Sequence, residues 1–213
     1  MERQNYILAR ALVQVYASGI VFLGWAQSRA IFLWFTPFTL LACSGLLLYN
    51  EQKKSRSLCL YVALVYAGGF ALEALGVATG KVFGAYHYTQ VLGWGVLNVP
   101  LVIGLNWAVL IYAACLFVDL HLRTQHIFIK SALVGLLLVS LDWLIEPVAI
   151  ALNFWQWHST QVPLQNYVVW FCYSALAAAA FFGLKICAKN KLAGLFLAVN
   201  FVFFGALRVF FTL

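Results

Sequence analysis

Seven long apolar runs set the limits on what this chain can fold into. They lie near residues 6–26, 30–49, 57–77, 97–119, 130–152, 166–187 and 191–212. A run of about 20 apolar residues can cross a bilayer as a helix, and these runs lack the alternation of polar and apolar residues that barrel strands need. The sequence therefore predicts an all-α, polytopic membrane bundle of about seven helices, with residues 1–213 forming a single integral membrane domain.

The charged residues are few, and they are unevenly placed. Only 9% of the residues are charged, and the net charge of +7 forms no basic stripe with interleaved aromatic residues, so nucleic acid is not an expected partner. Lys and Arg gather at the N-terminus and in the second, fourth and sixth connections. They are Arg3, Arg10, Lys53, Lys54, Arg56, Arg123, Lys130, Lys185, Lys189 and Lys191. By the positive-inside rule, we expect a cytoplasmic N-terminus in a bacterial inner membrane.

Three of the six acidic residues, Glu73, Asp142 and Glu146, fall inside the apolar runs. An ionised side chain at membrane depth costs about 2.5–3.5 kcal/mol on insertion scales, so such residues are usually paired, protonated or functional. The structural alternative is that Glu73 and Asp142 bond neighbouring helices or pair with Arg208 in the last run. Asp142 and Glu146 are four residues apart and share a helix face, where their repulsion predicts that one of them holds a proton.

The predicted topology brings the three acids to the same end of the bundle, because the third and fifth spans run in the same direction. Polar and aromatic residues of other spans, Asn106, Trp107, Asn166, Tyr167 and Arg208, fall at the same level. Two connections rich in Gly, Tyr, Trp and His, TGKVFGAYHYTQVLGWGVLN and NFWQWHSTQVPLQN, would cover this end. We therefore expect a pocket there that is reachable from the membrane.

The chemistry that suits such a pocket is acid catalysis on a lipophilic substrate. Five tryptophans could stabilise a cationic intermediate with their ring faces, although all except Trp107 fit an interfacial belt equally well: Trp94, Trp107, Trp143, Trp155 and Trp157. His87 and His158 could bind substrate or relay protons, or lie on the surface. His121 and His126 match no common metal spacing, and we expect neither a metal nor a cofactor. A retinal protein is excluded because no lysine lies in mid-membrane.

Four sequence blocks closely resemble a known family. Residues 73–88, EALGVATGKVFGAYHY, fit the pattern E-x-x-G-x-x-T-G-x-x-F-G-x-Y-x-Y of the CruF-type carotenoid 1,2-hydratases, a membrane carotenoid-biosynthesis family that includes bisanhydrobacterioruberin hydratase. LGWGVLNVPLVIGLNW (92–107), LDWLIEPVAIALNFWQW (141–157) and VPLQNYVVW (162–170) follow in the same order. Two positions depart from the pattern: Glu146 stands where the family often has Asp, and the stretch before Val162 lacks glycine.

The resemblance implies addition of water across the terminal double bond of an acyclic carotenoid, without a cofactor. It implies that Asp142 and Glu146 form an acid and base pair, with Glu73 as a third acid. The substrate and its water would contact Trp107, Asn106, Tyr86, Tyr88, His87, Trp157, Asn166 and Tyr167. The expected partners are a lipophilic carotenoid, water, membrane lipid and other enzymes of the pathway.

Three other functions remain open from the sequence. A carotenoid end-group cyclase would use the same carbocation but would capture it with an alkene. A proton-coupled transporter would also need acids inside the membrane. It would favour polar residues along the cytoplasmic half of the spans as well, whereas we expect that half to be nearly uniformly apolar. A non-catalytic carotenoid-binding protein is the third alternative.

Overall fold

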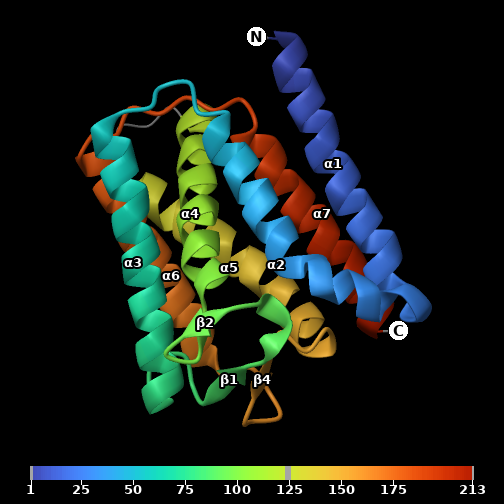
Figure 1. The fold of residues 1–213 in the computed structure, drawn as a ribbon. Coiled ribbons are helices and arrows are strands. Elements are labelled where there is room, and N and C mark those ends of the chain that lie inside the picture. Colours follow the sequence, from blue (N-terminus) through green and yellow to red (C-terminus); the bar gives the residue numbers. More distant parts are fainter. Residues whose placement is uncertain (1, 123–125, 213) are drawn as a thin grey trace.

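Seven long helices make up the computed structural model, which describes residues 2–122 and 126–212 (Figure 1). They are α1 (Glu2–Gly24), α2 (Ala26–Tyr49), α3 (Arg56–Thr79), α4 (Leu101–His121), α5 (Ile127–Ala151), α6 (Leu164–Gly183) and α7 (Ala193–Thr212). All seven are long and apolar enough to cross a membrane. The prediction of an all-α, polytopic bundle is confirmed.

Local chemistry explains where several of these helices begin and end. The side chain of Ser55 accepts a hydrogen bond from the backbone N–H of Leu58 at 3.1 Å and caps the start of α3. Gly80 follows α3 with φ of 66°, a left-handed conformation that glycine adopts at helix ends without strain. Pro100 and Pro163 directly precede α4 and α6, where the missing N–H of proline removes no helix hydrogen bond.

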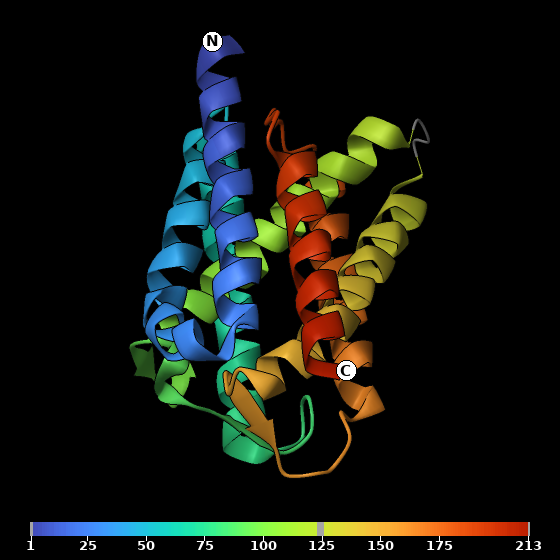
Figure 2. The ribbon, with the colours of Figure 1, turned by 90° about the vertical axis from the view of Figure 1, so that its right-hand side faces the viewer.

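Helix α4 is the centre of the bundle. It packs against α2, α3, α5, α6 and α7, and every residue from Trp107 to Cys115 is buried. Helix α1 lies at the edge, where it contacts α2 and α7; Figure 2 shows α1 and α7 side by side. Large apolar side chains such as Trp34 and Phe128 are exposed on the outer helix faces, as expected of a protein that lies in lipid.

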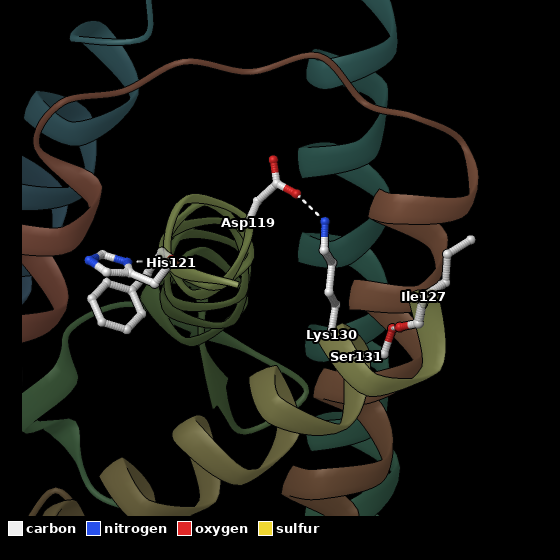
Figure 3. Close-up of polar contacts among 6 residues, drawn as sticks. Asp119, His121, Ile127, Lys130 and Ser131 are labelled. Atoms are coloured by element: carbon white, nitrogen blue, oxygen red, sulfur yellow. Dashed lines mark hydrogen bonds and ion pairs between the residues drawn. The ribbon is translucent and has the colours of Figure 1, made fainter. Parts of the chain in front are cut away.

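The two ends of the bundle differ in character. In Figure 1, the N-terminus and the α2–α3 and α6–α7 connections lie at one end, and the short strands lie at the other. This is the arrangement of connections that the predicted topology requires; Arg123, one of its ten cations, lies outside the described residues. Near the α4–α5 connection, Lys130 forms an ion pair with Asp119 at 2.6 Å, while His121 points away from this pair and contacts the carbonyl oxygen of Phe117 at 2.8 Å (Figure 3).

Two small strand pairs cover the other end. Strand β1 (Tyr86–Tyr88) in the α3–α4 connection pairs antiparallel with β4 (Trp155–Trp157) in the α5–α6 connection. Strands β2 (Gly95–Val96) and β3 (Val99–Pro100) form a hairpin immediately before α4. The prediction that the two unusual connections cover the same end is confirmed, and they are joined there by a β-ladder.

Candidate active site

Glu73, on the last two turns of α3, is buried among three hydrogen-bond donors. The hydroxyls of Tyr86 and Tyr88 both donate to Glu73 Oε2, the second of them at 2.9 Å. On α4, the indole nitrogen of Trp107 donates to Glu73 Oε1 at 2.9 Å. Both carboxyl oxygens therefore have donors, which is what a polar group removed from water requires.

Asp142 and Glu146 lie one turn apart on α5, and a single side chain connects them. The amide nitrogen of Asn166, in the first turn of α6, lies 2.7 Å from Asp142 Oδ2 and 3.3 Å from Glu146 Oε1. All three residues are buried. The spacing of four residues on α5 and the start of α6 thus bring two carboxyl groups and one amide together.

The β1–β4 ladder supplies aromatic hydrogen-bond donors to two of the three acids, Glu73 and Glu146. In the ladder Tyr86 lies opposite Trp157 and Tyr88 opposite Trp155, with ring centroids 5.0 Å and 5.9 Å apart. The two indole nitrogens donate to Glu146 Oε2, from Trp155 at 3.2 Å and from Trp157 at 2.8 Å. Because alternate strand residues face the same side, one face of the ladder holds hydroxyls for one acid and indoles for another.

The two tyrosines of β1 act as donors in this arrangement. Burial, together with the nearby Glu73 carboxyl, raises the pKa of Tyr86 and Tyr88 well above the usual value for a phenol. Their hydroxyls therefore remain protonated at physiological pH. A protonated hydroxyl can donate to Glu73, whereas a phenolate would repel it.

The three acids line one cavity of about 50 Å³. This volume exceeds the roughly 10–15 Å³ that a single water needs, so there is room for a small number of water molecules. Asp142 is fully buried, and its Oδ1 atom has no hydrogen-bond partner among the described residues. Within the cavity wall, Asp142 therefore presents a carboxyl oxygen that is available to a small polar molecule.

Most of the residues predicted from the sequence meet at this cavity. Those that line it are Glu73, Asp142, Glu146, Asn106, Trp107, Tyr86, Tyr88, Trp157 and Asn166. The side chain of Asn106 makes no hydrogen bond within the part of the chain that the structure describes.

Two predicted residues do not line the cavity. His87 is exposed and lies beside His158, with ring centroids 5.7 Å apart. It lies between Tyr86 and Tyr88 on β1, so strand alternation turns it away from them. Tyr167 is half-buried on α6, next to Asn166.

Three aromatic residues of the cavity wall, Phe83, Trp155 and Trp170, were not among the residues expected to contact the substrate, although Trp155 was one of the five tryptophans considered for stabilising a cation. Trp155 stands two residues before Trp157, so the alternation of strand β4 would have placed both on one face. Trp170 lies one turn after Asn166 on α6, and its ring packs against that of Trp107, with ring centroids 3.9 Å apart and an angle of 32° between the ring planes. The spacing of four residues on α6 was the signal that would have found it.

The remaining tryptophans and Arg208 lie outside the cavity wall. Trp94 is 91% exposed and Trp143 is 53% exposed, which fits an interfacial position. Arg208 on α7 stacks on the ring of Trp143 at 3.5 Å and donates to its carbonyl oxygen at 2.7 Å. Within residues 2–122 and 126–212, no three His, Cys, Asp or Glu side chains are grouped as metal ligands would be.

The expectation that the opposite end is nearly uniformly apolar is wrong. Glu51, after α2, is buried and accepts hydrogen bonds from the hydroxyl of Tyr112, from Lys53 N at 2.6 Å and from Lys189 N at 2.7 Å. Asn190 also contacts the Tyr112 hydroxyl at 3.2 Å. Glu51 and Asn190 fall outside the predicted spans, but the α2–α3 and α6–α7 connections fold onto α4 and bring both of them to Tyr112.

The fold and the site together define a polytopic membrane protein with a small cavity lined by carboxyl and aromatic side chains at one end of the bundle. The chain belongs to a family of carotenoid biosynthesis proteins, since residues 31–213 match the family model described as "Carotenoid biosynthesis protein". No curated protein and no solved structure matches the chain. The match covers most of α2 and all of α3 to α7, and so includes the whole cavity wall.

Proposed function

We propose that this protein is a carotenoid hydratase that adds water across the terminal C=C bond of an acyclic carotenoid end group. Membership of the carotenoid biosynthesis family supports a polyene substrate. One observation supports this type of reaction. The buried carboxyls of Asp142 and Glu146 both contact the Asn166 amide, and both line a cavity that has room for water. Such a pair can hold a single proton, because two adjacent carboxylates repel.

The proposed reaction needs one proton donor and one proton acceptor. A protonated carboxyl of the Asp142–Glu146 pair gives its proton to the CH carbon of the terminal (CH₃)₂C=CH group, leaving a cation on the tertiary carbon. The oxygen of a cavity water forms the new C–O bond and loses a proton to the other carboxylate. The product is a tertiary alcohol, and transfer of the proton between the two carboxyls restores the starting state.

The other cavity residues would stabilise the cation and position the water. In this proposal the Glu73 carboxyl and the ring faces of Trp107 and Trp157, all residues of the cavity wall, would stabilise positive charge near the reacting carbon. Asn106 lines the cavity and lacks a partner among the described residues, which makes it a candidate ligand for the water or the product hydroxyl.

Transport is the less favoured function. A proton pathway through the bundle would connect the cavity with the buried Glu51 at the opposite end. On the central helix, the residues between Trp107 and Tyr112 are Ala108, Val109, Leu110 and Ile111, all apolar and buried. Helix α4 therefore offers no polar side chain between the two sites.

Expression in a bacterial host that accumulates an acyclic carotene tests the proposal directly. Hydratase activity would yield a product heavier by one water, and growth in ¹⁸O-labelled water would place the label in the new hydroxyl. An end-group cyclase would leave the mass unchanged but alter retention and absorbance. If the protein binds pigment but changes neither its mass nor its retention and absorbance, it is neither a hydratase nor a cyclase.

We also propose an orientation, in which the N-terminus is cytoplasmic and the cavity lies toward the outer face of a bacterial inner membrane. The support is the gathering of Lys and Arg at the end of the bundle opposite to the β1–β4 ladder.

A further inference from the structure

A second, larger cavity adjoins the acid cavity on the side of α1. It has a volume of about 280 Å³ and is walled by α1, α2, α4 and α7. We call it the α1 groove. Four of its residues also line the acid cavity: Ile103, Asn106, Ile145 and Trp155. The two spaces are therefore adjacent, and a ligand that lies in the groove has one end beside the acid cavity.

The wall of the α1 groove is mainly apolar and rich in aromatic rings. Phe32 and Phe35 come from α2, and Phe203 and Phe204 come from α7. On α1, Tyr16 packs edge-on against Phe203 with ring centroids 5.4 Å apart. Flat aromatic surfaces of this kind suit a flat, apolar, conjugated chain.

Several polar residues of the groove are bonded within their own helices. Ser18 donates to Val15 O at 2.9 Å, Thr39 to Phe35 O at 2.9 Å and Asn200 to Phe196 O at 2.7 Å. These three side chains therefore add little polarity to the groove. The side chain of Asn106, which lines both the groove and the acid cavity, makes no such bond among the described residues. The wall of the groove is therefore more polar beside the acid cavity than elsewhere.

A third cavity, of about 730 Å³, lies between α2 and the segment around Trp94. It is also apolar and is larger than the α1 groove. It shares no lining residue with the acid cavity, and only Leu92 with the groove. A ligand in this cavity alone would not reach the carboxyls. Its larger volume therefore does not make it a better candidate than the α1 groove for binding the substrate.

We propose that the α1 groove binds the polyene chain of the carotenoid next to its reacting end. This rests on the proposed function for the chemistry of the acid cavity, and on the family for the chemistry of the ligand. The rest of the chain would extend into lipid past Val15 and Phe35, which line the groove and are exposed. Helix α1 precedes the matched residues 31–213, so one wall of the substrate site would come from outside the family match.

Bound pigment, rather than turnover, provides the test. All variants would carry Glu146→Gln, so that the carotene is not consumed, and would be purified in mild detergent from a host that accumulates acyclic carotene. Thr36→Phe on α2 and Ser18→Phe on α1 add bulk inside the groove. Each should retain at least about tenfold less carotenoid per protein, the change expected when binding weakens by about 1.4 kcal/mol.

Three variants on α2 serve as controls. Ala42→Phe adds the same ring on an exposed face that lines none of the three cavities, and it should retain pigment. Thr36→Val removes the hydroxyl without adding bulk and should also retain it. Ala30→Phe adds bulk at the wall of the 730 Å³ cavity; a loss of pigment with this variant, but not with Thr36→Phe, would overturn the proposal.

The result can be separated from the fate of the hydratase proposal. If pigment loss follows Thr36→Phe and Ser18→Phe while the unsubstituted protein adds no water, the groove is supported and the hydratase is not. If the unsubstituted protein hydrates its substrate but Thr36→Phe and Ser18→Phe bind as much pigment as Ala42→Phe, the groove proposal is wrong and the hydratase stands. Size-exclusion profiles matching Ala42→Phe would show that the groove variants are folded.

Discussion

The amide nitrogen of Asn166 lies 2.7 Å from Asp142 Oδ2, a contact between the first turn of α6 and the C-terminal half of α5. Both side chains are buried. The same amide reaches Glu146 Oε1 at 3.3 Å, so one donor sets the positions of two carboxyls. Most of the expected behaviour of the site follows from this arrangement.

Loss of either carboxyl of the pair should remove activity. Asp142→Asn and Glu146→Gln each keep the shape of the side chain but remove a group that gains and loses a proton, so product should fall by about 10²–10⁴-fold. Product would be measured by mass spectrometry in the carotene-accumulating host, relative to protein in the membrane. Asp119→Asn is the control, because Asp119 belongs to an exposed ion pair at the other end of the bundle. Full activity in both site variants would contradict the assignment.

Asn166 should act as a positioning residue rather than as a proton carrier. Asn166→Leu removes the shared donor and leaves two carboxyls without it, so we expect hydration to fall by roughly tenfold or more, as when a buried charged hydrogen bond is lost. The pH profile of the remaining activity should also shift, because loss of the amide hydrogen bonds changes how tightly the two carboxyls hold a proton. Asn50→Leu is matched to it, since the buried Asn50 donates to Asn5 Oδ1 at 2.8 Å and lines none of the three cavities. Equal effects of both variants would indicate a general packing defect.

Gly69 on α3 should be intolerant of a side chain, because it lies against Trp107. A methyl group there would come within 2.8 Å of the Trp107 ring and would displace the residue whose indole bonds to Glu73. Gly69→Ala should lower the free energy of unfolding by about 1–3 kcal/mol and reduce activity. Gly45→Ala on α2 meets no atom within 4 Å and should be neutral or slightly stabilising. Thermal unfolding in detergent would distinguish the two, and similar melting temperatures would argue against close packing at Gly69.

Glu51 should contribute to stability and not to chemistry. Glu51→Ala leaves the Tyr112 hydroxyl and the backbone N–H of Lys189 without their acceptor, at a cost of about 1–3 kcal/mol. Asp119→Ala breaks an exposed ion pair and should cost at most about 1 kcal/mol. Melting temperatures would rank the two variants, and hydration per folded protein should stay unchanged in both. A specific loss of activity in Glu51→Ala would instead connect this end of the bundle to the reaction.

The proposed orientation can be tested with two matched cysteines in a background lacking the five native ones. Ser159 in the α5–α6 connection and Ser57 at the start of α3 are both exposed and lie at opposite ends of the bundle. A membrane-impermeant maleimide should label Ser159→Cys in intact spheroplasts, and Ser57→Cys only after lysis. The reverse pattern would place the acid cavity on the cytoplasmic side.

By itself, the sequence determined the membrane class, the number of helices and the end of the bundle at which the acids meet. These properties depend on the length and order of apolar runs, and on the direction in which each span must run. The spacing of Asp142 and Glu146 also settled that they share a helix face. Local geometry of this kind can be read along the chain.

Only the tertiary structure decided which side chains reach the acids. The pairing of β1 with β4 joins connections that are about 70 residues apart, and it selects Trp155 while turning His87 outward. Burial of Glu51 likewise depends on two loops folding onto α4. Such contacts follow from packing between distant segments, whose hydrogen-bonding partners no local periodicity specifies.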